Sequence, residues 1–264
     1  MEYPFHLLGS YSSLQVFFFG CITALSFTGT GKLALERLSG KKVPLLYSLP
    51  TGTLLGTLMF SLLVQLVGFT RLASADVLKG IWCVQTFLGG MALLHSLMRL
   101  PKKSPIASVS KRIVACAVSK IDAAIMCIWV LLLATTLFIS LAPSTKIDEL
   151  YYHMQVPLRL LQDGGLFYYR EPWPAMIPHM HYQIAAAPLY ALGVVDALNV
   201  TSWWLGAIFA WFCAAVVLRK GGDLPRALIV SMGMYSGMYA PVWFVTGGTG
   251  RSEERRVGRE CRSR

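Results

Sequence analysis

Long apolar runs are the feature of this sequence that most limits how it can fold. Four of them precede position 143: Leu14 to Leu35, Val43 to Phe69, Val77 to Met98 and Ile121 to Ala142. Each reaches the roughly 20 residues that a helix needs to cross the hydrocarbon core of a bilayer. Because a backbone in lipid must satisfy its own hydrogen bonds, such runs fold as helices. The pattern predicts an all-α, polytopic integral membrane protein.

The composition agrees with a membrane protein and excludes several other classes. Only 14% of the residues are charged and the mean hydropathy is +0.55, whereas soluble domains carry about 25% charged residues. The formal net charge of +11 does not indicate nucleic-acid binding, because the basic residues fall in short clusters between apolar runs. The cysteines lie mostly in or beside apolar runs, and their spacing indicates neither a disulfide framework nor a zinc site.

The basic clusters predict the orientation of the chain. Positions 32–42 and 99–120 are rich in Lys and Arg, which favours the cytoplasmic side of the membrane. The N-terminus is then external, and four transmembrane helices occupy residues 1–143. The polar segment 144–181 is external again, and its excess of acidic over basic residues agrees with that position.

Residues 182–250 are predicted to form two or three further membrane helices. Apolar sequence resumes in three runs, Tyr182 to Val195, Val200 to Leu218 and Ala227 to Val245. The first run is short for a span and contains Pro188. If it spans, Arg219 and Lys220 lie outside; if it is re-entrant, they lie inside. Charge favours six spans in total and the family resemblance given below favours seven, so we predict six to seven with a preference for seven.

The external segment 144–181 is predicted to contain an interfacial helix. Ser144 or Thr145 can begin it, Pro157 kinks or restarts it, and Asp163-Gly164-Gly165 ends it. Its apolar face would lie against lipid or other helices, and its polar face toward water. Helical spacing puts these residues on the polar face: Asp148, Tyr152, Gln155, Arg159 and Gln162.

The segment IDELYYH, residues 147–153, carries the motif D-x-L-x-Y-H, and Gly164-Gly165 and a proline-containing stretch follow it. Over about Ala142 to Gly193 this pattern resembles the first large external loop of bacterial polytopic glycosyltransferases of the C-type fold. These include protein mannosyltransferase-like and aminoarabinose-transferase-like enzymes. The resemblance implies transfer of a sugar from a polyprenyl-phosphate donor to an acceptor hydroxyl, at the external face of a bacterial inner membrane. The implied partners are the lipid-linked sugar donor and membrane lipids, with no nucleic acid.

The resemblance implies that Asp148 and Glu149 are the catalytic carboxylates. Asp148 matches the loop carboxylate that acts as general base or as ligand of a divalent metal, and Glu149 can substitute for it. The family often has an acidic residue soon after the last proline of the loop, whereas Pro178 is followed by HMHYQ. We therefore assign no metal site, although a divalent metal remains an open alternative.

Substrate-binding roles fall to four residues. Tyr152 and His153 match the Tyr-His pair of the family, and we assign them to positioning the substrate or the lipid phosphate. Arg159 and Arg170 are candidates for the phosphate from charge alone, because cations offset the charge of a leaving phosphate.

Plainer interpretations stay open. Asp148 can simply cap the predicted helix, because a carboxylate stabilises a helix N-terminus. Tyr152 can be an interfacial anchor, and His153 can be a solvated loop residue. Two other functional classes are a transporter or flippase, and a membrane protein with no catalysis whose external loop binds a partner. Lys79, His95 and Asp122 lie near the ends of predicted spans, which argues against transport.

The last residues, RSEERRVGRECRSR, differ from everything before them. They closely resemble the translated readthrough of a common sequencing adapter and depart from it at Arg259. We expect 251–264 to be a non-native tail; the alternative is a genuine basic cytoplasmic tail. Residues 1–250 are then expected to be the first part of a longer protein, with 182–250 an incomplete domain, and the chain as given is expected to be inactive.

Overall fold

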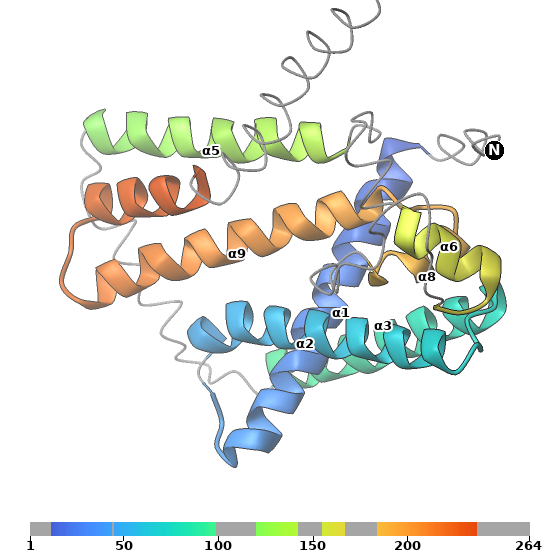
Figure 1. Ribbon diagram of the computed structural model, residues 1–264. Coiled ribbons are helices and arrows are strands. Elements are labelled where there is room, and N and C mark those ends of the chain that lie inside the picture. The colour runs from blue at the N-terminus through green and yellow to red at the C-terminus, as the bar shows by residue number, and fades with distance from the viewer. Residues whose placement is uncertain (1–11, 44, 99–119, 142–154, 167–183, 237–264) are drawn as a thin grey trace, which may run out of the picture.

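The computed structural model describes residues 12–43, 45–98, 120–141, 155–166 and 184–236. Regular secondary structure in these ranges is entirely helical (Figure 1). The elements are α1 (Ser13–Ser39), α2 (Leu45–Phe69), α3 (Ala75–Met98), α5 (Lys120–Ser140), α6 (Gln155–Asp163), α8 (Ala187–Ala191) and α9 (Ala197–Arg219). A further helix covers 224–236.

Five helices among the described residues are long and apolar enough to cross a membrane. They are Ser13–Ser39, Tyr47–Phe69, Ala75–Ser96, Asp122–Ser140 and Ala197–Arg219. Each corresponds to one of the apolar runs of the sequence. The chain is therefore an all-α, multi-pass integral membrane protein, as predicted.

Helix α1 is longer than the apolar run that predicted it. It begins after Ser12, whose hydroxyl accepts a hydrogen bond from the Gln15 amide at 3.3 Å while the Gln15 side chain accepts one from the Ser12 amide at 2.9 Å. This capping box satisfies backbone donors that a helix start leaves unpaired. The helix ends only at Gly40, which adopts the left-handed conformation with φ of 64°.

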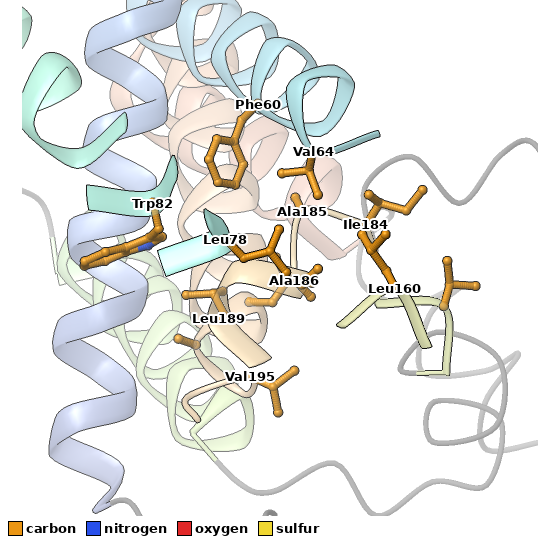
Figure 2. Close-up of a cluster of buried hydrophobic side chains, with 14 of the residues drawn as sticks. Phe60, Val64, Leu78, Trp82, Leu160, Ile184, Ala185, Ala186, Leu189 and Val195 are labelled. Atoms are coloured by element: carbon orange, nitrogen blue, oxygen red, sulfur yellow. The ribbon is translucent and has the colours of Figure 1, made fainter. Parts of the chain in front are cut away.

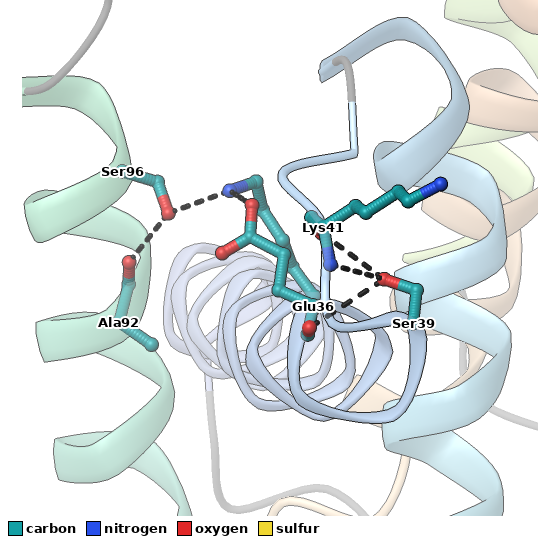
Figure 3. A network of polar contacts seen from close by, with 6 residues as sticks. Glu36, Ser39, Lys41, Ala92 and Ser96 are labelled. Carbon is teal, nitrogen blue, oxygen red and sulfur yellow. Dashed lines mark hydrogen bonds and ion pairs between the residues drawn. The ribbon is translucent and has the colours of Figure 1, made fainter.

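Helix α1 also carries a charged pair that contacts α3. The Lys32 ammonium is buried and lies 2.7 Å from the Glu36 carboxylate. It also donates to the Ser96 hydroxyl of α3 at 2.9 Å, and Ser96 in turn donates to the Ala92 carbonyl (Figure 3). The sequence grouped Lys32 with the solvent-facing cluster at 32–42, but the structure makes it part of the contact between α1 and α3.

Helices α1, α2 and α3 pack closely because glycines line their contacts. A methyl group on Gly29 would overlap the Gly89 carbonyl of α3, and one on Gly31 would overlap the Gly52 carbonyl of α2. Small residues allow backbones to approach in this way in membrane bundles. Hydrogen bonds between helices add to the packing: the Trp82 indole donates to the Thr23 hydroxyl at 3.0 Å.

Helix α9 joins the first three helices to α5. The Thr201 hydroxyl donates to the Gly20 carbonyl of α1 at 3.3 Å, and the Trp203 indole donates to the Leu133 carbonyl of α5 at 3.1 Å. The helix over 224–236 lies beside α5 (Figure 1), where the hydroxyls of Tyr235 and Thr136 are 2.7 Å apart. α9 therefore begins near the first turns of α1 and runs in the same direction.

The apolar run Tyr182 to Val195 is not a continuous helix in its described part, 184–195. It consists of turns and the five-residue helix α8, and Gly193 has a positive φ of 80°. Pro188 and Gly193 explain the break, because proline suits the start of a helix and glycine its end. This favours six spans over seven. In agreement, Arg219 at the end of α9 contacts Tyr47 near the start of α2, on the side of the bundle that also holds the basic end of α1.

Candidate functional site

Most of the predicted site residues lie outside the residues that the structure describes. Those outside are Asp148, Glu149, Tyr152, His153 and Arg170. Arg159 is described and lies half-buried on α6. The described region nearest to the motif in sequence is α6, together with the elements that share a hydrophobic cluster with it: the α2–α3 connection, α8 and the start of α9.

Helix α6 follows the motif segment closely and is an amphipathic helix, as predicted. Pro157 stands in its first turn, where a proline restarts a helix without losing a hydrogen bond. The helix ends at Asp163, and Gly164 takes a positive φ of 67°. Val156 and Leu160 are buried, whereas Gln162 is exposed. The apolar face thus packs against other helices, which was one of the two alternatives that the sequence left open.

The chain after α6 is attached to the connection between α2 and α3. The Ala73 amide donates to the Gly164 carbonyl at 3.0 Å, and the Leu166 amide donates to the Gly68 carbonyl at 2.9 Å. Gly165 fits between them: a methyl group there would lie 3.1 Å from the Gly68 oxygen. These backbone hydrogen bonds fix the position of the end of α6.

A hydrophobic cluster fixes the same region from the other side. Figure 2 shows side chains from α2, α3, α6 and the 184–198 segment meeting at one end of the bundle. Leu78 and Leu189 are fully buried in it, and Leu160 is only 1% exposed. Together with the backbone hydrogen bonds, this packing holds α6 and α8 in place.

Two charged residues of this region were missed as site candidates from the sequence. Arg71, in the α2–α3 connection, lies beside Gly165 and has a positive φ of 59°, a conformation that costs energy for a residue with a side chain. Asp196 precedes α9 at the usual capping position without a side-chain capping hydrogen bond. The only sequence signals for them are weak: Arg71 is a basic residue in a short connector, and Asp196 is an acidic residue shortly before an apolar run.

The electrostatics around α8 keep a phenol protonated. Burial and, second, the negative charge of Asp196 raise the pKa of Tyr190 well above its ordinary value. Both causes disfavour the phenolate, so Tyr190 is a hydrogen-bond donor at any physiological pH. Within the described ranges, no group of three or more His, Cys, Asp or Glu side chains is arranged to hold a metal ion.

Comparison with known proteins found no matching family model, no matching curated protein and no matching solved structure. Function is therefore inferred from the motif at 148–153 and from the geometry of the described residues beside it.

Proposed function

We propose that this chain is part of a membrane glycosyltransferase that moves a sugar from a polyprenyl-phosphate donor to an acceptor hydroxyl, at the external face of a bacterial inner membrane. The observation that carries the proposal is the position of the motif. D-x-L-x-Y-H ends two residues before α6, and α6 is anchored to the bundle by packing and by backbone hydrogen bonds. A carboxylate that must act as a base gains from such an attachment, because correct positioning contributes much of the rate of a bound reaction.

The proposed reaction begins with the acceptor hydroxyl. Asp148 accepts its proton while the oxygen attacks the anomeric carbon of the sugar. The bond between that carbon and the phosphate oxygen breaks, and polyprenyl phosphate leaves with the electron pair. Tyr152 and His153 position the sugar or the phosphate. Glu149, the next residue in the sequence after Asp148, can take the place of Asp148 as the base.

Cations are needed where the leaving phosphate gains charge. Arg159 is suited to this role because α6 leaves its side chain half-exposed beside the buried face of the helix. Arg170 supplies a second positive charge in the same loop. If a divalent metal takes part, Asp148 would be its ligand, and the metal would offset the phosphate charge.

A transporter or flippase is the second candidate, and one contact favours it. The buried Lys32 and the half-buried Glu36 form an ion pair within a candidate span, and ionisable residues in spans often mark a transport path. The pair lies near the end of α1, however, and bridges to α3 through Ser96, which also suits a purely structural role. Uptake or flipping that depends on Lys32 without any sugar transfer would favour this candidate.

The test of the glycosyltransferase is Asp148→Asn in a full-length protein that carries this sequence. Transfer of a labelled sugar from a polyprenyl-phosphate donor should fall about 10²- to 10⁴-fold, the usual contribution of a general base. The control is Asp223→Asn, the same chemical change just beyond the end of α9. Asp223 accepts a hydrogen bond from the Arg226 amide at 3.0 Å, and Asn accepts such a capping hydrogen bond equally well. Full activity of Asp148→Asn in folded protein would remove Asp148 from the mechanism.

A further inference from the structure

The end of the bundle opposite α6 and α8 holds an aromatic residue and a cation at the borders of two spans. Tyr47 is the first residue of one candidate span and Arg219 is the last residue of another. Polar sequence follows Arg219 directly, and the basic pair Lys41-Lys42 lies a few residues before Tyr47, with Leu45 and Leu46 in between. Such borders lie at the depth of the lipid headgroups, where tyrosine and arginine are favoured.

The two side chains form a fixed unit. An Arg219 Nη1 donates to the Tyr47 hydroxyl at 2.6 Å, and the guanidinium carbon lies 5.5 Å from the centre of the Tyr47 ring. The Tyr47 ring is held in turn by an edge contact with Phe212, with ring centres 5.8 Å apart. The hydrogen bond to Tyr47 uses one of the five N–H donors of the Arg219 guanidinium, and the other four can bind a second acceptor.

Positive charge around this unit is not neutralised by neighbouring carboxylates. Glu36 pairs with Lys32 at 2.7 Å, and Asp223 pairs with Arg226 at 3.4 Å. Among the described residues no ion pair involves the remaining cations at this end, which are exposed: Arg37, Lys41, Lys42, Arg219 and Lys220. An anion that approaches the Tyr47–Arg219 unit is therefore attracted by a net positive field.

We propose that Tyr47 and Arg219 bind the headgroup phosphate of an anionic phospholipid. Guanidinium groups bind phosphate oxygens through paired hydrogen bonds, and contact with the Tyr47 ring orients this guanidinium before the lipid arrives. Apolar side chains exposed on the same two helices, Leu54 and Trp211, offer a surface to the acyl chains. The surrounding lysines select a lipid with net negative charge over a zwitterionic one.

Binding of phosphatidylglycerol and phosphatidylcholine to the purified chain, followed by native mass spectrometry, tests the site. Phosphatidylglycerol should bind about fivefold more tightly, the equivalent of one basic residue at an anionic surface. Arg219→Gln should weaken phosphatidylglycerol binding and reduce this preference, because it removes the phosphate contact and one positive charge. Tyr47→Phe should have a smaller effect in the same direction, because the guanidinium loses its hydrogen-bonded support. Arg226→Gln is the matched control and should leave the preference unchanged, because Arg226 is exposed and already paired with Asp223.

Two results would overturn the assignment. One is equal affinity of the wild-type chain for the two lipids, which needs no variant and so does not depend on how the variants fold. The other is displacement of phosphatidylglycerol by an equal concentration of inorganic phosphate, which would make this a site for soluble anions. Far-UV circular dichroism of Arg219→Gln and Tyr47→Phe confirms that any loss of preference occurs in folded protein.

Discussion

Gly89 and Gly90 are neighbours on α3, yet the structure gives them opposite surroundings. A methyl group on Gly89 would overlap the backbone of Ser26 on α1, whereas one on Gly90 would meet nothing within 4 Å. The close approach of α1 and α3 thus depends on the absence of a side chain at Gly89, as it does at Gly29. The hydrogen bond from Trp82 to Thr23 forms across the same contact.

We predict that Gly89→Ala and Gly90→Ala shift stability in opposite directions. Gly89→Ala should lower the free energy of unfolding by about 1–3 kcal/mol, the usual effect of forcing atoms into a packed contact. Gly90→Ala should be neutral or raise it by up to about 1 kcal/mol, because alanine favours a helix. Thermal unfolding in detergent measures both. Equal effects of the two variants would contradict the close contact between α1 and α3.

At the scale of single elements, α6 is held by a few contacts that can be removed one at a time. Leu160 is its most buried side chain and packs near Gly68. Leu160→Ala should cost about 2–5 kcal/mol of local stability and release α6 from the α2–α3 connection. Gln162→Ala, on the exposed side of the same helix, is the control.

Hydrogen exchange measures the release of α6 directly. The amides of Ala73 and Leu166 bond to the Gly164 and Gly68 carbonyls, so both should lose protection in Leu160→Ala and keep it in Gln162→Ala. Unchanged protection in Leu160→Ala would show that packing of Leu160 does not hold this segment.

The sequence predicted the long helices well and the short ones less well, for a physical reason. An apolar run of span length has one stable fold in lipid, so α2 ends at Phe69 as expected, and α6 stops at Asp163 because Gly164 suits a positive φ. The run from Tyr182 is also apolar but short, and Pro188 was its only sequence signal for the turns and the helix α8 that occupy most of its described part. The candidate site was predicted from a motif, and its geometry at 148–153 lies outside the described residues. Arg71 could not be found because its position beside Gly165 depends on a contact distant in sequence.

For the whole molecule, the direction of α9 decides how many times the chain crosses the membrane. Because α9 runs parallel to α1 and ends beside the start of α2, α6 and Lys220 should lie on opposite sides. In a background without native cysteines, Gln162→Cys should react with an impermeant thiol reagent from outside, and Lys220→Cys only after permeabilisation. Both positions are exposed. Reaction of both from outside would instead require the segment around α8 to span.

The buried Lys32 also has a consequence for how the chain enters the bilayer. A lysine within a span opposes transfer from the insertion channel to lipid, by about 2.5–3.5 kcal/mol at the helix centre and by less toward a helix end such as the position of Lys32. Glu36 alone offsets only part of this cost for an isolated α1. Ser96, which completes the contact, is synthesised 64 residues later. We therefore expect α1 to remain at the channel until α3 emerges, so that biogenesis starts with the joint release of three helices.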